Sequence, residues 1–314
     1  MDIADLQKLA QRTRSEREIS VALIFASCLL GLFLFIPLGQ KKSFAPAAVA
    51  TSTTPDAFAS IPLEANAAIV YDLATGKTLY AKNADAQLPL ASLTKLLTIY
   101  AALGELSPRT PITIPAAATH LDTPRAFSAG QTFALSDLAR LTLTASLNDG
   151  AAAIAIATAD RENRSQSDML ASAAAALGLS QTYAVNGSGL DVNTEISGGY
   201  GSARDLARLA GALVARAPTI AEATTQSFAR AVSKNGVQFS VKNTDPIITT
   251  IPRLLLSKTG YTDLAGGNLA LIFDSGIEHP IAIVVLGSSQ KARFTDGTAL
   301  VAATLAHFAG IASL

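Results

Sequence analysis

Three short strings of polar residues follow one another in an order that could build a nucleophilic site. They are Ser92-Leu93-Thr94-Lys95, Ser146-Leu147-Asn148 and Lys258-Thr259-Gly260. A serine and a lysine three positions apart share one face of a helix, so the Lys95 amine can reach the Ser92 hydroxyl. Lysine accepts a proton only when it is neutral, and burial or a second cation such as Lys258 lowers its pKa. The spacing therefore predicts a serine nucleophile with a lysine base.

The other two strings offer the groups that such a nucleophile needs. Ser146 and Asn148, at an expected helix start, can supply a proton relay and an amide that orients the substrate. Lys258-Thr259-Gly260 is typical of a strand whose glycine lets a peptide approach closely and pair as an extra strand. Each string alone is a weak signal, and the Ser-x-x-Lys spacing recurs at 288–291. Their order, on two helix starts and a strand, predicts one common site.

Strand patterns occur at both ends of the C-terminal 250 residues, and helical patterns lie between them. The expected strands are 67–73, 78–82, 228–232, 237–241, 254–260, 269–273 and 281–286. The expected helices are 92–103, one capped by Ser136, one from Ser146, 167–177, 203–215 capped by Ser202, and one from about Thr298. This arrangement predicts an α+β fold, in which both ends form one antiparallel sheet and a helical subdomain is inserted.

The N-terminal part has the pattern of a membrane anchor. Residues 19–38 carry no charge over twenty positions, a length that crosses a bilayer as a helix. Basic residues are more frequent before this run than after it, which favours a cytoplasmic N-terminus. We expect a cytoplasmic segment at 1–18, a transmembrane signal-anchor at 19–39, a linker at 40–64 and a catalytic domain at 65–314. The alternative is a signal peptide cleaved after Ala48-Val49-Ala50.

The composition excludes several classes of function. The 24 basic and 24 acidic residues give a net charge of zero, so no broad electrostatic drive toward nucleic acid exists. One cysteine and three scattered histidines provide neither a disulfide framework nor a zinc motif. We expect no metal or organic cofactor and no nucleic-acid partner.

The sequence resembles the serine-type D-alanyl-D-alanine carboxypeptidases, the low-molecular-mass penicillin-binding proteins, over essentially 65–314. The three strings are those of penicillin-binding proteins and class A β-lactamases. Further similar segments are AAIVYDLATGKTLYAKNADAQLPLASLTKLLT at 67–98, SLNDGAAAIA at 146–155, NGSGLD at 186–191, GSARDLARLA at 201–210 and SKTGYTDLAGGNLA at 257–270. The resemblance implies a β-lactamase/transpeptidase-like fold, with a five-stranded antiparallel sheet and the site between sheet and helical subdomain.

The resemblance also implies a role for each residue. Ser92 would be the nucleophile, Lys95 the general base and Ser146 the proton shuttle toward the leaving D-alanine. Asn148 would hold the substrate amide, whereas Lys258 and Thr259 would bind the terminal carboxylate beside Gly260. Backbone N–H groups of Ser92 and Tyr261 would form the oxyanion hole. The implied substrate is the pentapeptide of peptidoglycan, outside the cytoplasm, and β-lactams would be covalent inhibitors.

The chain departs from the family pattern near the third string. Leu255, Leu256 and Ser257 precede Lys258 where members often carry Asp-Gly, and Asp245 stands where the family commonly has a second Asn. The predicted activity is that of a D-Ala-D-Ala carboxypeptidase. A D,D-endopeptidase that cuts cross-links would use the same residues and remains an alternative. A β-lactamase is less favoured because no Glu after Ser146 is followed by x-x-Leu-Asn. A non-catalytic wall-binding or β-lactam-sensing domain is also less favoured, because Ser92 and Lys95 are both present.

Overall fold

The computed structural model describes residues 3–34 and 57–310, which belong to two separate units, Met1–Ser52 and Thr53–Leu314. The described part of the first unit is a single helix, α1 (Ile3–Leu34). Across the described residues, no helix combines the length and the apolar character that crossing a bilayer requires. The predicted transmembrane helix at 19–39 is thus not found there, and its last residues, 35–39, lie outside the described ranges, as does 40–56 of the predicted linker.

A five-stranded antiparallel sheet forms the centre of the second unit and confirms the predicted sheet. In spatial order its strands are β10 (Leu254–Thr262), β11 (Gly266–Asp274), β12 (Pro280–Ser288), β1 (Ala67–Asp72) and β2 (Thr78–Lys82). The first and last parts of the chain meet where Ala67 of β1 pairs with Leu286 of β12. The edge strand β10 carries the third sequence string, so this string lies at the margin of the sheet.

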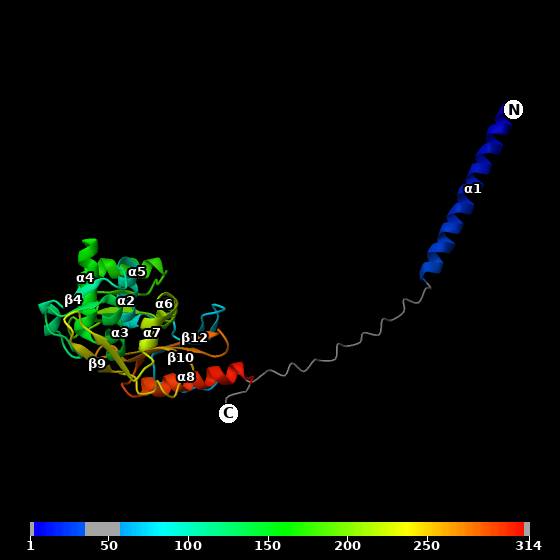
Figure 1. The fold of residues 1–314 in the computed structure, drawn as a ribbon. Helices are drawn as coiled ribbons and strands as arrows, with labels where there is room; N and C mark the ends of the chain where they lie inside the picture. The colour runs from blue at the N-terminus through cyan, green and yellow to red at the C-terminus, as the bar shows by residue number, and fades with distance from the viewer. Residues whose placement is uncertain (1–2, 35–56, 311–314) are drawn as a thin grey trace. The chain divides into compact units, whose positions relative to one another are not determined.

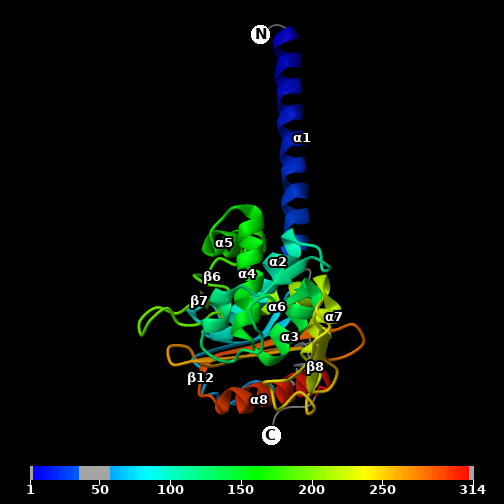
Figure 2. The ribbon, with the colours of Figure 1, turned by 60° about the vertical axis from the view of Figure 1, so that its left-hand side comes forward.

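Both faces of the sheet are covered, which explains why its inner strands are apolar almost throughout. On β11, Leu269, Leu271 and Phe273 pack toward the C-terminal helix α8 (Ala292–Phe308), whereas Ala270 and Ile272 pack toward the other helices. This alternation follows the two-residue period of a strand. Figures 1 and 2 show α8 on one face of the sheet and the remaining helices of this unit on the opposite face.

The helices between β2 and β10 form the inserted subdomain. They are α2 (Thr94–Glu105), α3 (Leu135–Ala145), α4 (Asn148–Glu162), α5 (Gln166–Ala176), α6 (Ala203–Arg216) and α7 (Pro218–Ala223), with 3₁₀ turns η1 (Ala91–Leu93) and η2 (Ala116–His120). Three small sheets connect them: β3 (Leu88–Pro89) with β7 (Gly199–Gly201) and β6 (Tyr183–Ala184), β4 (Pro111–Thr113) with β5 (Thr132–Ala134), and β8 (Phe228–Val232) with β9 (Gln238–Lys242).

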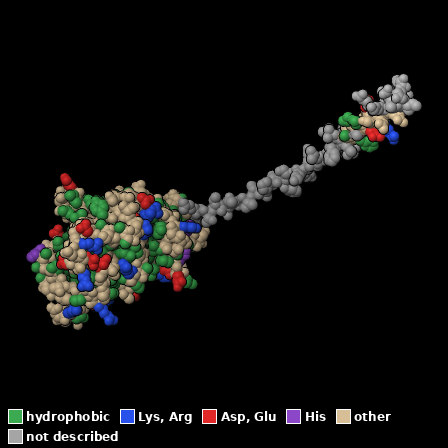
Figure 3. Space-filling view, turned by 90° about the horizontal axis from the view of Figure 1, so that it is seen from above, with side chains coloured by type: hydrophobic (Ala, Val, Ile, Leu, Met, Phe, Trp, Pro, Cys, Tyr) green, Lys and Arg blue, Asp and Glu red, His purple; other side chains and the backbone are tan. Residues whose placement is uncertain are grey.

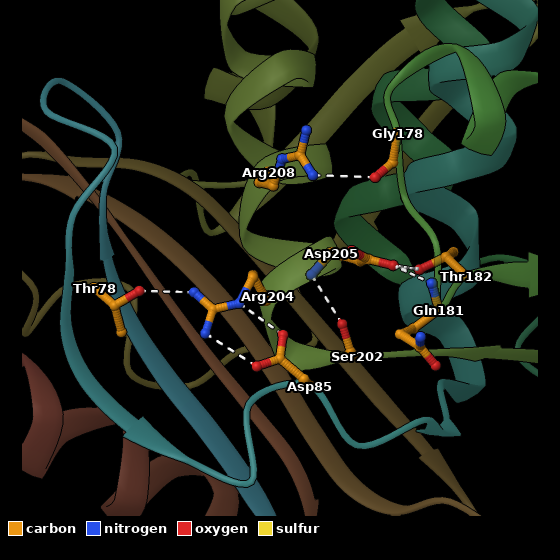
Figure 4. Close-up of polar contacts among 9 residues, drawn as sticks. All are labelled: Thr78, Asp85, Gly178, Gln181, Thr182, Ser202, Arg204, Asp205 and Arg208. Atoms are coloured by element: carbon orange, nitrogen blue, oxygen red, sulfur yellow. Dashed lines mark hydrogen bonds and ion pairs between the residues drawn. The ribbon is translucent and has the colours of Figure 1, made fainter.

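The start of α6 ties the subdomain to the sheet edge (Figure 4). Ser202 Oγ accepts a hydrogen bond from the Asp205 backbone N–H at 3.1 Å, as expected for an N-cap. The Asp205 carboxylate in turn accepts from the backbone N–H of Gln181 at 2.8 Å. Arg204 forms a two-pronged ion pair with Asp85, with distances of 2.7 and 3.1 Å. Helix α6 is therefore held at its first turn from both sides.

Several element boundaries differ from the sequence expectation. Ser146 does not start a helix, because it ends α3 in a left-handed conformation with φ 58°, and α4 begins at Asn148. The N-cap of α3 is Ala134 rather than Ser136, and it has no side-chain cap. Helix α8 begins at Ala292, before the expected start at Thr298.

The folded unit also extends further toward the N-terminus than residue 65. Ala57 and Phe58 are 1% and 6% exposed, and the Phe58 ring lies 5.8 Å from that of Tyr80 and 5.6 Å from that of His307. Asp296 of α8 accepts hydrogen bonds from the backbone N–H groups of Glu64 and Ala65. Residues 57–64, assigned to a linker from their composition, therefore pack on the α8 face.

Candidate active site

Ser92 lies in the tight turn that leads from β3 into α2. It occupies the middle of η1, two positions before the first residue of α2, and is half-buried. The preceding residue, Ala91, adopts φ 47°, a conformation that costs a non-glycine residue of order 1 kcal/mol or more. Edge strand β10 packs on this turn, and a Cβ added to Gly260 would lie 3.0 Å from Leu90 O and 3.2 Å from Ser92 N. The nucleophile candidate is thus presented at the junction of sheet and helical subdomain.

Lys95, one turn further along, contacts the Ser92 hydroxyl directly. Its Nζ lies 2.7 Å from Ser92 Oγ, 2.7 Å from Asn148 Oδ1 and 2.7 Å from Ser188 O, and the side chain is fully buried. Three contacts match the three protons of an ammonium group. In the neutral amine, the two carbonyl oxygens can keep two N–H donors, which leaves the lone pair facing the Ser92 hydroxyl. The geometry thus suits proton transfer from serine to lysine.

The environment of Lys95 favours its neutral form. Burial lowers the pKa of Lys95 to about 7, while the nearby charge of Asp149 acts in the opposite direction. We expected the charge of Lys258 to contribute to this shift, but burial is its main cause. The pKa of Lys258 is itself lowered well below its usual range, first by burial and then by the charges of Lys95 and Arg293. Near neutral pH, then, a substantial fraction of Lys95 can act as a base.

Ser146 and Asn148 flank the turn between α3 and α4. The left-handed Ser146 directs its hydroxyl toward β10, where Lys258 Nζ donates to Ser146 Oγ at 2.8 Å. The Asn148 side chain is fixed at both ends, because Oδ1 accepts from Lys95 and Nδ2 donates to Asp122 O at 2.9 Å. The turn therefore connects the two buried lysines, one through Ser146 and the other through Asn148.

The third string runs along β10 toward the open margin of the sheet. Lys258 and Thr259 are 1% and 4% exposed, and Thr259 Oγ1 lies 2.7 Å from Thr244 Oγ1. Tyr261 follows Gly260 and leaves 45% of its surface exposed, without joining the hydrogen-bonded group. The structure thus gathers Ser92, Lys95 and Asn148 in one group and Ser146 and Lys258 in another, and the α3–α4 turn joins the two.

Further residues, absent from the sequence prediction, support the third string from behind. Arg293 at the start of α8 is 8% exposed and donates to Gly260 O at 2.5 Å. Ser257 Oγ donates to the buried Asp245 carboxylate at 2.5 Å, and burial raises the pKa of Asp245. Ser257 belongs to one departure from the family pattern and Asp245 is the other, so the two departures contact each other. Arg293 carried no recognisable local signal.

Two cavities flank the site. One, of about 410 Å³, borders the Lys95 side, because Ser188, Asn186 and Asp122 line it. The other, of about 600 Å³, borders the Thr259 side and includes Thr244 and Arg293. No group of three or more His, Cys, Asp or Glu side chains suited to a metal occurs among the described residues. On the face of the molecule seen in Figure 3, basic and acidic side chains are interspersed.

Comparisons with known proteins converge on one family. The family model described as D-alanyl-D-alanine carboxypeptidase, peptidase S11, matches residues 50–290. A D-alanyl-D-alanine endopeptidase of Pseudomonas aeruginosa is 32% identical over 81% of this chain and 82% of its own length. A D-alanyl-D-alanine carboxypeptidase of Bacillus subtilis is 27% identical over 88% of this chain and 69% of its own.

The fold is also that of solved structures. The crystal structure of penicillin-binding protein D2 from Listeria monocytogenes, in its ampicillin-bound form, superposes with a TM-score of 0.65. The two sequences are 28% identical, and the match covers 78% of this chain and 98% of that one. The chain therefore has the penicillin-binding, transpeptidase-like fold.

Proposed function

The chain belongs to the D-alanyl-D-alanine carboxypeptidase family of serine peptidases, peptidase S11, and on this premise we propose that it hydrolyses D-alanyl bonds of peptidoglycan stem peptides through a Ser92 acyl-enzyme. The observation that carries the proposal is the 2.7 Å contact between Ser92 Oγ and the buried Lys95 Nζ. Removal of the terminal D-alanine is the activity proposed first. The names of relatives include both carboxypeptidase and endopeptidase.

In the first half of the reaction, neutral Lys95 accepts the proton of the Ser92 hydroxyl as Oγ attacks the carbonyl carbon of the penultimate D-alanine. The C–N bond to the last residue then breaks, and the departing amine takes up the proton that Lys95 accepted, relayed through Ser146, so that Lys95 is neutral again. In the second half, a water molecule gives a proton to Lys95 as its oxygen attacks the ester carbonyl carbon. Lys95 returns this proton to Ser92 Oγ as the ester bond breaks, which releases the shortened peptide and restores Ser92. Asn148 is proposed to hold the substrate amide in position.

Recognition of the peptide end is assigned to the third string. Lys258 and the buried Arg293 are the basic residues at this end of the site, beside the Thr259 hydroxyl. The pKa of Lys258 is lowered first by burial and then by the charges of Lys95 and Arg293, while Asp245 acts in the opposite direction. A substrate carboxylate placed there would form charge-assisted hydrogen bonds. The backbone N–H groups of Ser92 and Tyr261 are proposed to stabilise the oxyanion.

The test is the intact mass of the protein during incubation with excess penicillin, with Ser92→Ala as the control. We expect one persistent adduct per chain that forms only when Ser92 is present, because a β-lactam carbonyl would acylate the same hydroxyl. Release of D-alanine from a pentapeptide, followed in parallel, would distinguish a peptidase from a mere binding protein. Consumption of penicillin without a lasting adduct would indicate a β-lactamase, and intact penicillin would refute the assignment of the site.

We also propose that the chain works outside the cytoplasm, tethered by its N-terminal segment. The uncharged run at 19–38 and the basic residues before it support this placement. The test is fractionation of cells that produce the full chain or a form lacking residues 1–52. The full chain should stay with membranes after an alkaline wash, and its catalytic unit should be digested when protease is added outside the cytoplasmic membrane. Recovery of the full chain in the soluble cytoplasm would refute the tether.

A further inference from the structure

A tight turn between β6 and β7 supplies one of the three oxygen atoms around Lys95. The Lys95 Nζ donates to Ser188 O at 2.7 Å, and Ser188 is buried. The peptide unit that carries this carbonyl also carries the N–H of Gly189. Because a peptide unit is planar, its C=O and its N–H turn together. Whatever holds the Gly189 N–H therefore also sets the direction from which Ser188 O meets the lysine.

Asn186 holds this peptide unit by its N–H. Its Oδ1 accepts from the Gly189 N–H at 2.8 Å, from the Ser188 N–H at 3.1 Å and from Ser188 Oγ at 2.8 Å. Its Nδ2 donates to Leu190 O at 2.9 Å. An asparagine suits this position, because its side-chain amide both accepts and donates and readily bonds backbone two residues further on. One side chain thus fixes the backbone on both sides of Ser188.

The same turn packs on the segment that holds the nucleophile candidate. Gly189 has φ 73°, and a Cβ added there would collide with Ala91 O in η1. The Gly187 carbonyl accepts from Thr98 Oγ1 of α2 at 2.7 Å. These contacts seat the turn on η1 and α2, whereas the orientation of the peptide unit within it depends on the asparagine amide.

The direction of the Ser188 carbonyl matters because of how few groups a neutral amine offers. A neutral lysine has two N–H donors and one lone pair. With Asn148 Oδ1 and Ser188 O each 2.7 Å from Nζ, both donors are occupied and the lone pair faces Ser92 Oγ. If the Ser188 carbonyl turned away, the amine could rotate and direct an N–H at the hydroxyl. In that orientation it could not accept the serine proton.

Charged groups from several elements also act on Lys95. Burial lowers the pKa of Lys95, while Asp149 in the first turn of α4 acts in the opposite direction. The pKa of Lys258 on β10 is lowered by burial and then by the charge of Lys95, so the two cations repel each other. Three further ionisable residues line the cavity of about 410 Å³ beside Ser188, namely His120, Asp122 and Asp191. Asn186 is itself uncharged and acts by hydrogen bonding alone.

We propose that Asn186 is a positioning residue, which fixes the Ser188 carbonyl so that the lone pair of Lys95 faces the nucleophile. The inference rests on the proposed serine-peptidase function and adds to it a residue that acts through the backbone rather than on the reacting atoms. Its acceptor, Oδ1, holds one end of the peptide unit, and the lysine meets the other end. A hydrogen bond accepted from the N–H also polarises the carbonyl and strengthens it as an acceptor.

The test measures the rate constant of Ser92 acylation by penicillin in the full-length protein from pH 5 to 10. We expect Asn186→Ala to lower the plateau rate at least tenfold, because the Gly189 N–H then loses its acceptor. Asn186→Asp keeps an acceptor for the same donors, so its plateau should stay within threefold of the wild type. Its added negative charge should move the midpoint of the profile upward by about half a pH unit or more, since a nearby anion favours the ammonium form of Lys95.

Asn193 provides the matched control in the same loop. Its Oδ1 accepts from the backbone N–H groups of Glu195 and Ile196 at 2.8 and 2.9 Å, and all three residues are exposed. Asn193→Ala and Asn193→Asp should both leave the plateau within twofold of the wild type and the midpoint unchanged. Thermal melting of each variant separates a loss of fold from a loss of rate.

The outcomes separate this inference from the function on which it rests. Either a wild-type plateau in Asn186→Ala or an unchanged midpoint in Asn186→Asp would overturn the inference, since the residue would then only stabilise the loop. An equal shift of the midpoint in Asn193→Asp would overturn it too. If Asn186→Ala does not fold, the midpoint of Asn186→Asp decides alone. If penicillin does not acylate Ser92 of the wild type at any pH, the proposed function itself fails, and the inference with it.

Discussion

Two lysines in one buried space define the chemistry at the scale of single residues. Lys95 contacts the nucleophile candidate and Lys258 contacts Ser146, and neither is paired with a carboxylate in a salt bridge of the described structure. Both therefore have lowered pKa values, with burial as the largest cause. The arrangement supports the proposed roles, a base for Lys95 and a carboxylate-binding group for Lys258.

Acylation of Ser92 should accordingly depend on pH. The pKa of Lys95 is about 7, so its neutral fraction, and with it the acylation rate, should rise through pH 7. Below that value the rate should fall about tenfold per pH unit, because the protonated amine cannot accept the serine proton. The measurement is the rate constant of penicillin adduct formation from pH 5 to 10.

Lys95→Arg serves as the control for this profile, since arginine stays protonated at every pH tested. The Lys95→Arg variant should lose acylation at every pH, rather than show the same profile shifted to another pH range. A wild-type rate that is flat from pH 6 to 10 would exclude Lys95 as the general base.

The close approach of β10 to η1 is the decisive feature at the scale of elements. Gly260 has no need of unusual backbone angles, but a Cβ there would press on Leu90 O and Ser92 N. By contrast, Gly236 in the β8–β9 turn has φ 83° with open space around it. Gly260 is thus required because neighbouring backbone lies close to it, and Gly236 because of its own backbone conformation.

Gly260→Ala should therefore affect mainly acylation, and Gly236→Ala mainly stability. Gly260→Ala should slow penicillin acylation at least tenfold, because the strand must move away from the turn that holds Ser92. Gly236→Ala should lower the free energy of unfolding by about 1 kcal/mol and leave acylation unchanged. Mass spectrometry gives the rates, and urea denaturation gives the stabilities. Equal acylation by both variants would show that β10 does not constrain the nucleophile turn.

Local patterns predicted the elements well, and contacts between distant segments explain what they missed. The inner strands of the sheet follow from short apolar runs, and Ser202 with Asp205 predicted the start of α6. The Ser92–Lys95 contact follows from helical spacing. However, a helix was expected to begin at Ser146, before an alanine-rich run, whereas Ser146 ends α3 in a left-handed conformation and contacts Lys258. The Arg293–Gly260 contact joins α8 to β10, and no local pattern specifies such a pair.

At the scale of the whole molecule, the folded unit includes residues that look like a linker. Phe58 is buried against the α8 side of the sheet, although its neighbours are rich in Ala, Ser, Thr and Pro. Composition describes a segment on average and cannot reveal one apolar anchor within it. The helices that carry the candidate site lie on the opposite face of the sheet, so stability and activity should respond separately to the loss of Phe58.

A protein beginning at residue 65 should therefore be less stable than one beginning at residue 53. The expected difference in the free energy of unfolding is about 1.5–3 kcal/mol, the value of burying one large apolar side chain. Urea denaturation measures it, and Phe58→Ala in the longer protein should reproduce most of the loss. Penicillin acylation at a temperature where both are folded should agree within twofold. Equal stability of the two proteins would contradict the packing of this segment.

The pairing of β1 with β12 also has a consequence for folding during synthesis of the chain. Ala67 meets Leu286, and Ser146 meets a lysine 112 positions further along, so neither the sheet nor the anion-binding end can form until almost the whole chain has been made. Such distant pairings form late and slowly during folding. If Ser92 is the proposed nucleophile, a growing chain should carry it in an unreactive form, and penicillin should acylate it only when synthesis is nearly finished.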